Sequence, residues 1–195
     1  IDDLNGFRVE VIHPVLTTSL PKKFKHLEFN VHRWTYIKNV VFKGQAGLQF
    51  SINSTSDEQR DKMFGGMQMS LKEIAHLGEY MSPPLGRKYC LNFAYATDFE
   101  VDAKKVFSMF DSDKFMCKIT PIHNNNACRE NDIKTIGGYE TYAPYRKVEE
   151  DLKAAGFDVL VFIPSLDEED GLVTCGNAIL GGSKLKCDDG IIKTL

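Results

Sequence analysis

Apolar residues along the chain recur at two different spacings, which predicts strands and helices in alternation. Short runs rich in Val, Ile, Leu and Phe predict strands at residues 7–16, 47–53, 88–95, 115–122 and 158–164. Between them, apolar residues three and four positions apart predict helices at residues 22–42, with a break near Asn30, and at residues 70–81, 101–110 and 145–155. Helix-capping residues followed by acids predict a further helix at residues 54–63.

This alternation predicts an α/β fold with a mainly parallel sheet. The run Val159-Leu160-Val161-Phe162-Ile163 is apolar at every position, which is typical of strands in a sheet covered on both faces. Two architectures fit the pattern, a portion of an α/β barrel and a doubly wound sheet. In both of them the functional side chains gather at the carboxyl ends of the strands.

Composition and charge are those of an ordinary globular protein. Of the 195 residues, 43% are hydrophobic, which suffices for one sizeable core, so we expect a single domain over residues 1–195. The net charge of −3 gives no general attraction to a polyanion. Locally, basic residues on the first predicted helix suit either a solvated helix face or a nucleic-acid contact: Lys22, Lys23, Lys25, His26, Arg33 and Lys38.

The sequence contains no run of about 18 apolar residues that could span a membrane, and it does not open like a signal peptide. Its five cysteines are odd in number and widely spaced, which argues against a disulfide framework and for a reducing compartment. We therefore expect a soluble cytoplasmic protein without a membrane partner. The cysteines are Cys90, Cys117, Cys128, Cys175 and Cys187.

Polar and largely uncharged residues follow each predicted strand. Such residues suit a polar organic ligand better than a divalent metal, which prefers clustered carboxylate, imidazole or thiolate groups. The alternative is that Ser, Thr and Asn only cap the helices that follow. His123 stands out because it follows Pro121 at the end of a predicted strand. The wider set is Thr17, Thr18, Ser19, Ser51, Asn53, Ser54, Thr55, Asn92, Thr97, Asp98, Thr120, His123, Asn124, Asn125 and Ser165.

The passage SINSTSDEQRDKM at residues 51–63 resembles the strand-to-helix passage of radical S-adenosylmethionine (SAM) enzymes, nearest to the branch that methylates an adenine carbon in RNA. Ser51 and Asn53 match the strand end, and Arg60 lies in the matching helix start. Passages at residues 17–21, 118–123 and 174–177 resemble later segments of that family and keep the same order. The resemblance extends from about Val9 to Ile179 in short pieces.

The resemblance implies a partial (β/α) barrel that cradles SAM at its strand ends. By resemblance, Thr18, Ser19, Ser51, Asn53 and His123 would contact the cofactor, although the nearest branch usually has Asn where His123 stands. Cys175, followed by Gly176, matches the cysteine that carries a methyl group in that branch. The parent enzyme would reductively cleave SAM and would have an RNA substrate.

One family motif is absent, the Cys-x-x-x-Cys-x-x-Cys run whose thiolates hold the 4Fe-4S cluster. The resemblance therefore predicts the C-terminal portion of such an enzyme, inactive by itself and without a bound cofactor. Because the chain starts at Ile1, we expect the natural protein to extend upstream and to carry the motif there. Losing the first strands would leave a sheet edge open to self-association.

Two other readings remain at this stage. The first is a complete, non-catalytic α/β domain whose strand-end rim binds a nucleotide or a protein partner. The second is a doubly wound flavin or nucleotide-binding enzyme, for which bound yellow colour in the purified protein would be diagnostic.

Overall fold

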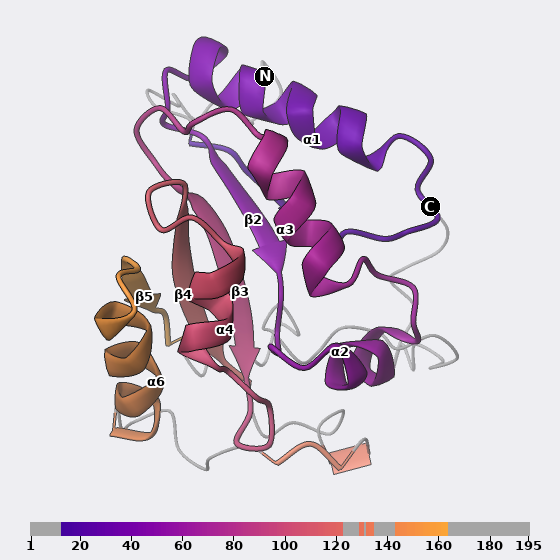
Figure 1. The fold of residues 1–195 in the computed structure, drawn as a ribbon, viewed down its shortest axis with the longest axis vertical. Helices are drawn as coiled ribbons and strands as arrows, with labels where there is room; N and C mark the ends of the chain where they lie inside the picture. Colours follow the sequence, from indigo (N-terminus) through magenta and orange to yellow (C-terminus); the bar gives the residue numbers. More distant parts are fainter. Residues whose placement is uncertain (1–12, 123–128, 131, 135–142, 164–195) are drawn as a thin grey trace, which may run out of the picture.

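Five parallel strands form a single sheet whose order in space follows their order in the chain, β1-β2-β3-β4-β5 (Figure 1). The structure is a computed structural model that describes residues 13–122, 129–130, 132–134 and 143–163. The strands are β1 (Val15–Thr18), β2 (Gly47–Ser51), β3 (Tyr89–Tyr95), β4 (Phe115–Pro121) and β5 (Val159–Val161). The helices are α1 (Leu27–Tyr36), the π-helical turn η1 (Ile37–Val41), α2 (Asp57–Phe64), α3 (Leu71–Tyr80), α4 (Ala103–Met109) and α6 (Ala143–Ala154).

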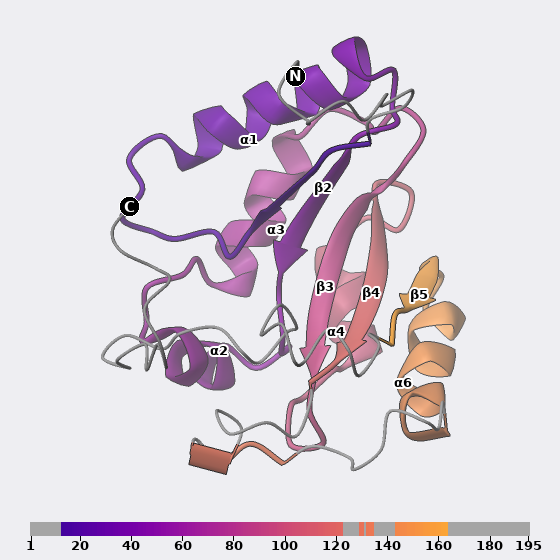
Figure 2. The ribbon, with the colours of Figure 1, turned by 180° about the vertical axis from the view of Figure 1, so that it is seen from behind.

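The strand order decides between the two predicted architectures. A doubly wound sheet reverses direction at a switch point, whereas here every new strand is added on the same side of the previous one. Because crossovers between parallel strands are right-handed, an order without reversal places the connecting helices on one face. Figures 1 and 2 show α3 and α4 on one face of the sheet, with the strands in front of them when seen from behind. Val31 of α1 belongs to the core on the same face.

The singly wound order confirms the α/β prediction with a parallel sheet and corrects the expectation that helices cover both faces. Among the described residues, helices cover one face, and the core lies between that face and the helices. Phe50, Phe93 and Phe115 are 0–1% exposed there. Val31 of α1, Ile74 of α3 and Val106 of α4, each buried, pack on them from the helix side.

The predicted boundaries fail mainly near the start of the chain. Thr17 and Thr18, which read as a turn, lie in β1 and pair in register with Gln49 and Phe50. β-branched Thr fits a pleated strand well, so the alignment with β2 outweighs its turn preference. Helix α1 runs through Asn30 without the predicted break, and its continuation widens into η1.

Two other predicted helices start as their capping residues indicate. The Ser56 hydroxyl accepts a hydrogen bond from the backbone N–H of Gln59 at the start of α2. At the start of α3, Ser70 and Glu73 form a reciprocal capping box. In the part of the chain that the structure describes, no helix has both the length and the hydrophobicity needed to cross a membrane.

Candidate functional site

The face of the sheet opposite α1, α3 and α4, here called the inner face, carries a polar row across neighbouring strands. Side chains alternate between the two faces of a strand, so Asn92 points away from the face of buried Leu91 and Phe93. The register aligns Ser51 of β2 with Asn92, and Asn92 with Lys118 of β4. A hydroxyl, an amide and an ammonium group thus lie side by side on one face.

Two of the inner-face side chains are hydrogen-bonded to each other. Thr120 Oγ1 donates to Asn92 Oδ1 at 3.0 Å, and both residues are buried. This bond joins β3 to β4 on the inner face and occupies the amide oxygen of Asn92. The Asn92 amide nitrogen, a donor, is the part of that side chain left for a ligand.

Asn53 lies where β2 ends and turns toward α2. Its φ of 63° is in the left-handed region, which Asn tolerates better than most residues. Its backbone N–H donates to the Asn92 carbonyl at 3.2 Å, and its side-chain oxygen accepts from the Ala94 N–H at 3.2 Å. The residue therefore fixes the exit of β2 against β3, next to Ser51.

The two predicted residues at the end of β1, Thr18 and Ser19, lie in a different setting. Thr18 is in register with Phe50, which faces the helices, and its hydroxyl accepts from the Leu20 N–H at 3.0 Å. Ser19 Oγ accepts from Gln68 Nε2 at 3.3 Å. The structure thus groups Ser51 with Asn53, and it places Thr18 at the end of β1 and Ser19 directly after it. His123 and Cys175 lie outside the described residues.

Two other members of the wider set have structural partners, although the residue that caps α2 is their neighbour Ser56. Ser54 Oγ donates to Gln59 Oε1 at 2.6 Å and accepts from the Ser56 N–H at 3.0 Å. Thr55 Oγ1 bonds to Glu100 Oε1 at 2.8 Å. These hydroxyl groups organise the start of α2 and the loop beside it.

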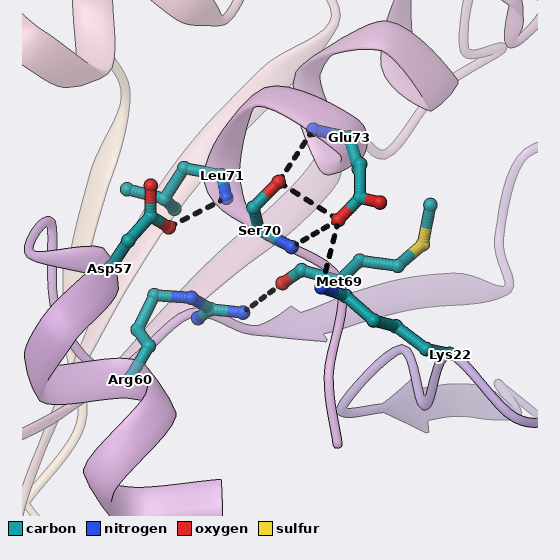
Figure 3. Close-up of polar contacts among 7 residues, drawn as sticks. All are labelled: Lys22, Asp57, Arg60, Met69, Ser70, Leu71 and Glu73. Atoms are coloured by element: carbon teal, nitrogen blue, oxygen red, sulfur yellow. Dashed lines mark hydrogen bonds and ion pairs between the residues drawn. The ribbon is translucent and has the colours of Figure 1, made fainter. Parts of the chain in front are cut away.

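Arg60 is the residue whose importance the sequence did not reveal. It matches the resembling motif, but the structure shows that it is 2% exposed and donates to the backbone oxygen of Ile52. It also donates to the backbone oxygen of Met69 at 3.0 Å (Figure 3). Burial lowers the pKa of its guanidinium, while Asp57 and Asp61 oppose that shift. Arg60 thereby ties the strand end at Ser51 and Asn53 to the link between α2 and α3. An Arg in a polar helix gives no sequence signal of such burial.

The described thiols do not fit an iron-sulfur cluster. Leu91 is in register with Cys117, so Cys90 and Cys117 face opposite sides of the sheet. Burial raises the pKa of Cys90 to about 11 and also raises the pKa of Cys117. Cluster ligands must be thiolates that converge on one point. Among the described residues, no group of three or more His, Cys, Asp or Glu side chains could hold a metal ion.

The predicted basic group on the first helix is smaller than its sequence indicates. Lys38 is buried and donates to the Leu85 carbonyl at 2.8 Å, so it does not belong to a surface patch. Lys22 pairs with Glu73 at 3.5 Å (Figure 3). Two aromatic side chains of α1 are also exposed, Phe29 at 64% and Tyr36 at 62%. The remaining exposed basic residues are Lys23, Lys25, His26 and Arg33.

Comparison with known proteins supports the architecture. No family model and no curated protein matches the sequence. Among solved structures, a radical SAM methyltransferase from Sphaerobacter thermophilus superposes with a TM-score of 0.54 over 84% of this chain, at 14% sequence identity. The chain has a radical SAM-like fold. It spans 43% of the length of that methyltransferase, so the likeness concerns part of the larger protein.

Proposed function

We propose that this chain is part of the barrel of a radical SAM enzyme and contributes to binding SAM on its inner face. The observation that carries the proposal is the polar inner face of a singly wound parallel sheet, whose architecture resembles that of a radical SAM methyltransferase. Uncharged donors and acceptors at the strand ends match the ribose hydroxyls and amino group of SAM. When bound, SAM would supply radical or methyl-transfer chemistry, and this chain would hold and orient it.

Ser51 and Asn53 are the described residues best placed for that contact. They follow one another at the end of β2, and Arg60 holds the segment between them by binding the Ile52 carbonyl. Thr18, Ser19 and His123 complete the proposed binding set, with Thr18 at the end of β1 and Ser19 directly after it. We place the 4Fe-4S cluster on a segment that is not among these 195 residues, since they lack its motif. On this proposal, residues 1–195 form the C-terminal portion of one barrel domain in a cytoplasmic enzyme.

Calorimetric titration of the complete enzyme, including the cluster segment, with SAM and with S-adenosylhomocysteine tests the binding role. We expect Ser51→Ala to weaken the binding of both compounds about tenfold, because the loss of a hydrogen bond worth about 1.4 kcal/mol corresponds to that factor. Ser108→Ala is the matched control, because its hydroxyl bonds to the Lys105 carbonyl within α4. Equal affinities in all three proteins, or no binding at millimolar ligand, would refute the proposed role.

The methyl-transfer part of the proposal concerns Cys175. With the complete enzyme, a reconstituted cluster and SAM labelled on the methyl carbon, we expect label on the peptide that contains Cys175 and none in Cys175→Ala. Cleavage of SAM with an unlabelled Cys175 would indicate radical chemistry of another kind. Sequencing the complete gene tests separately whether it encodes Cys-x-x-x-Cys-x-x-Cys.

A second candidate function is nucleic-acid binding through the outer surface of α1, with RNA as the partner. Arg33 lies between Phe29 and Tyr36 at helical spacing, and both aromatic rings are exposed. Stacking rings beside a guanidinium suit single-stranded nucleic acid. Salt-dependent binding of an unstructured RNA, weakened in Arg33→Ala and unchanged in Lys72→Ala on α3, would favour it. RNA binding that both variants leave intact would exclude this surface.

Self-association through the sheet edges is a further proposal. Among the described strands, β1 and β5 each pair on one side only, and unpaired edges can add a strand from another chain. Light scattering over a concentration series tests it, and a constant monomer mass would refute it.

A further inference from the structure

We propose that Lys118, together with Asn92 and Ser51, forms an oxyanion site on the inner face, so that the ligand held there carries a carboxylate or phosphate group. The inference deepens the proposed function, since it assumes a ligand on that face and adds the charge of its bound group. Lys118 is in register with Asn92 on one side and with Leu160 on the other. It therefore lies within the sheet and away from its edges.

The geometry presents one straight row of side chains across three strands. Neighbouring strands lie about 4.8 Å apart, so Ser51 and Lys118 are separated by roughly 10 Å across the row. Lys118 Nζ lies 4.6 Å from the centre of the Phe162 ring. A ring contact holds the ammonium in place through its charge and leaves its three N–H groups available to an acceptor.

The lack of a hydrogen-bonded or ion-paired partner distinguishes Lys118 from the other half-buried lysines that the structure describes. Lys88 pairs with Asp158 at 2.7 Å, and Lys114 donates to the Glu79 carbonyl at 3.0 Å. By contrast, none of the ion pairs or hydrogen bonds among the described residues involves Lys118 Nζ, although its residue is half-buried. Partial burial of a charge without a hydrogen-bonded partner costs free energy, which a bound anion would recover.

The row offers donors, which is the chemistry that an oxyanion requires. Thr120 occupies the acceptor oxygen of Asn92, so the amide presents its nitrogen to a ligand. Lys118 has donors alone, and the Ser51 hydroxyl can donate. A carboxylate or phosphate has acceptor oxygens alone, and charge-assisted bonds to such groups are the stronger kind. The carboxylate could belong to the methionine part of SAM and the phosphate to a nucleotide substrate.

Three adenosine compounds separate these sources: S-adenosylhomocysteine carries a carboxylate, adenosine 5′-monophosphate carries a phosphate, and adenosine carries neither. We expect Lys118→Gln to weaken binding of one or both anionic compounds by tenfold or more and to leave adenosine affinity unchanged. Lys72→Gln, which removes the same charge from an exposed position on α3, should change none of them. An effect on S-adenosylhomocysteine alone assigns the carboxylate, and an effect on the monophosphate alone assigns the phosphate.

The site is refuted if Lys118→Gln leaves both anionic compounds unchanged, or weakens adenosine by the same factor. Failure of the proposed function is a separate result, namely no binding of any adenosine compound. In that case a titration with inorganic phosphate tests the oxyanion site. The measurement is the change in backbone amide NMR shifts, and sodium chloride at equal ionic strength is the control. Shifts in β3 and β4 that vanish in Lys118→Gln would support the site, and their absence at millimolar phosphate would overturn it.

Discussion

The two faces of the sheet, built from the same strands, have opposite characters. In β4, Cys117 and Ile119 are fully buried under the helices, while Lys118 between them lies on the inner face. In β3, Leu91 and Phe93 face the helices and Asn92 faces inward. Successive side chains of a strand point to opposite faces, so neighbouring residues can be apolar on one face and polar on the other. The helix-covered face therefore carries the apolar core of the fold, and the inner face carries the polar row.

This comparison also explains why a parallel sheet can keep polar residues in its middle strands. Parallel sheets normally have both faces covered and apolar. In a barrel, however, the second face looks into the interior, where a ligand or other strands complete it. The polar row from Ser51 to Lys118 is therefore compatible with a barrel wall and out of place in a doubly wound sheet.

Truncating a core side chain should give the largest difference in stability between the two faces. Phe93 is 0% exposed, and Phe93→Ala should lower the free energy of unfolding by about 3–5 kcal/mol because it leaves a cavity. Met116, half-buried on the inner face, is the matched position, and Met116→Ala should cost roughly 1 kcal/mol or less for its smaller buried area. Urea unfolding monitored by circular dichroism measures both. Equal losses would mean that the inner face is also a packed core.

Arg60 lies where the end of β2 meets the link between α2 and α3, and replacing it should cause the second-largest loss of stability. In Arg60→Met the buried carbonyl of Ile52 and the partly buried carbonyl of Met69 each lose a donor, and an orphaned buried acceptor costs about 1–3 kcal/mol. We expect a loss near 2–3 kcal/mol by urea unfolding, together with weaker SAM binding, because the end of β2 is released. Arg60→Lys, which can replace one bond, should lose less. A stable Arg60→Met protein with unchanged ligand affinity would contradict the positioning role.

Most elements of the fold could be predicted from the sequence because each carries its own local signal. The capping box at Ser70 and Glu73 marks the start of α3, and the apolar runs of β3 and β4 mark their strands. The end of the first strand was predicted wrongly, because Thr17 and Thr18 join β1 through pairing with β2 rather than through local preference. The sequence also did not predict that helices cover only one face of the described sheet. That arrangement follows from the strand order, which depends on contacts between residues far apart in the sequence.

The candidate site was predictable in part for the same reason. Ser51 and Asn53 follow a recognisable strand, so their place at a strand end could be read directly. Lys118 could not be singled out, because its partners across the sheet are 26 and more residues away in sequence, as its register with Asn92 shows. Lys38 was assigned to a basic surface, although the structure buries it against the Leu85 carbonyl. Helical spacing alone does not show which face of a helix is covered by a distant loop, such as the one that contains Leu85.

A smaller effect should come from adding a methyl group to the covered face. Gly78 of α3 has no room for a side chain, because a Cβ there would lie 2.9 Å from Cζ of Phe115. The Phe115 ring cannot yield easily, since it also contacts Phe110 and Tyr89. Overpacking costs about 1–3 kcal/mol, and the better helix propensity of Ala returns up to about 1 kcal/mol. We expect Gly78→Ala to lose about 1–2 kcal/mol in urea unfolding, and a stabilised variant would show that the layer between α3 and β4 can adjust.

The smallest effect should come from the capping box that starts α3, and it should depend on pH. Removing the hydroxyl in Ser70→Ala frees the Glu73 N–H and should cost about 1 kcal/mol at neutral pH. Hydrogen bonds from the backbone and side chain of Ser70 lower the pKa of Glu73 in the folded state, so its contribution is fully present above the unfolded pKa of about 4.3. The contribution is lost as pH falls through the lower, folded pKa. The difference in unfolding free energy between wild type and Ser70→Ala should therefore be constant near neutrality and shrink in acid. Ser108→Ala, which has no carboxylate partner, should show no such change. A difference that stays constant down to about pH 3 would mean that the Ser70 cap acts on the backbone alone and that Glu73 adds nothing to the covering layer.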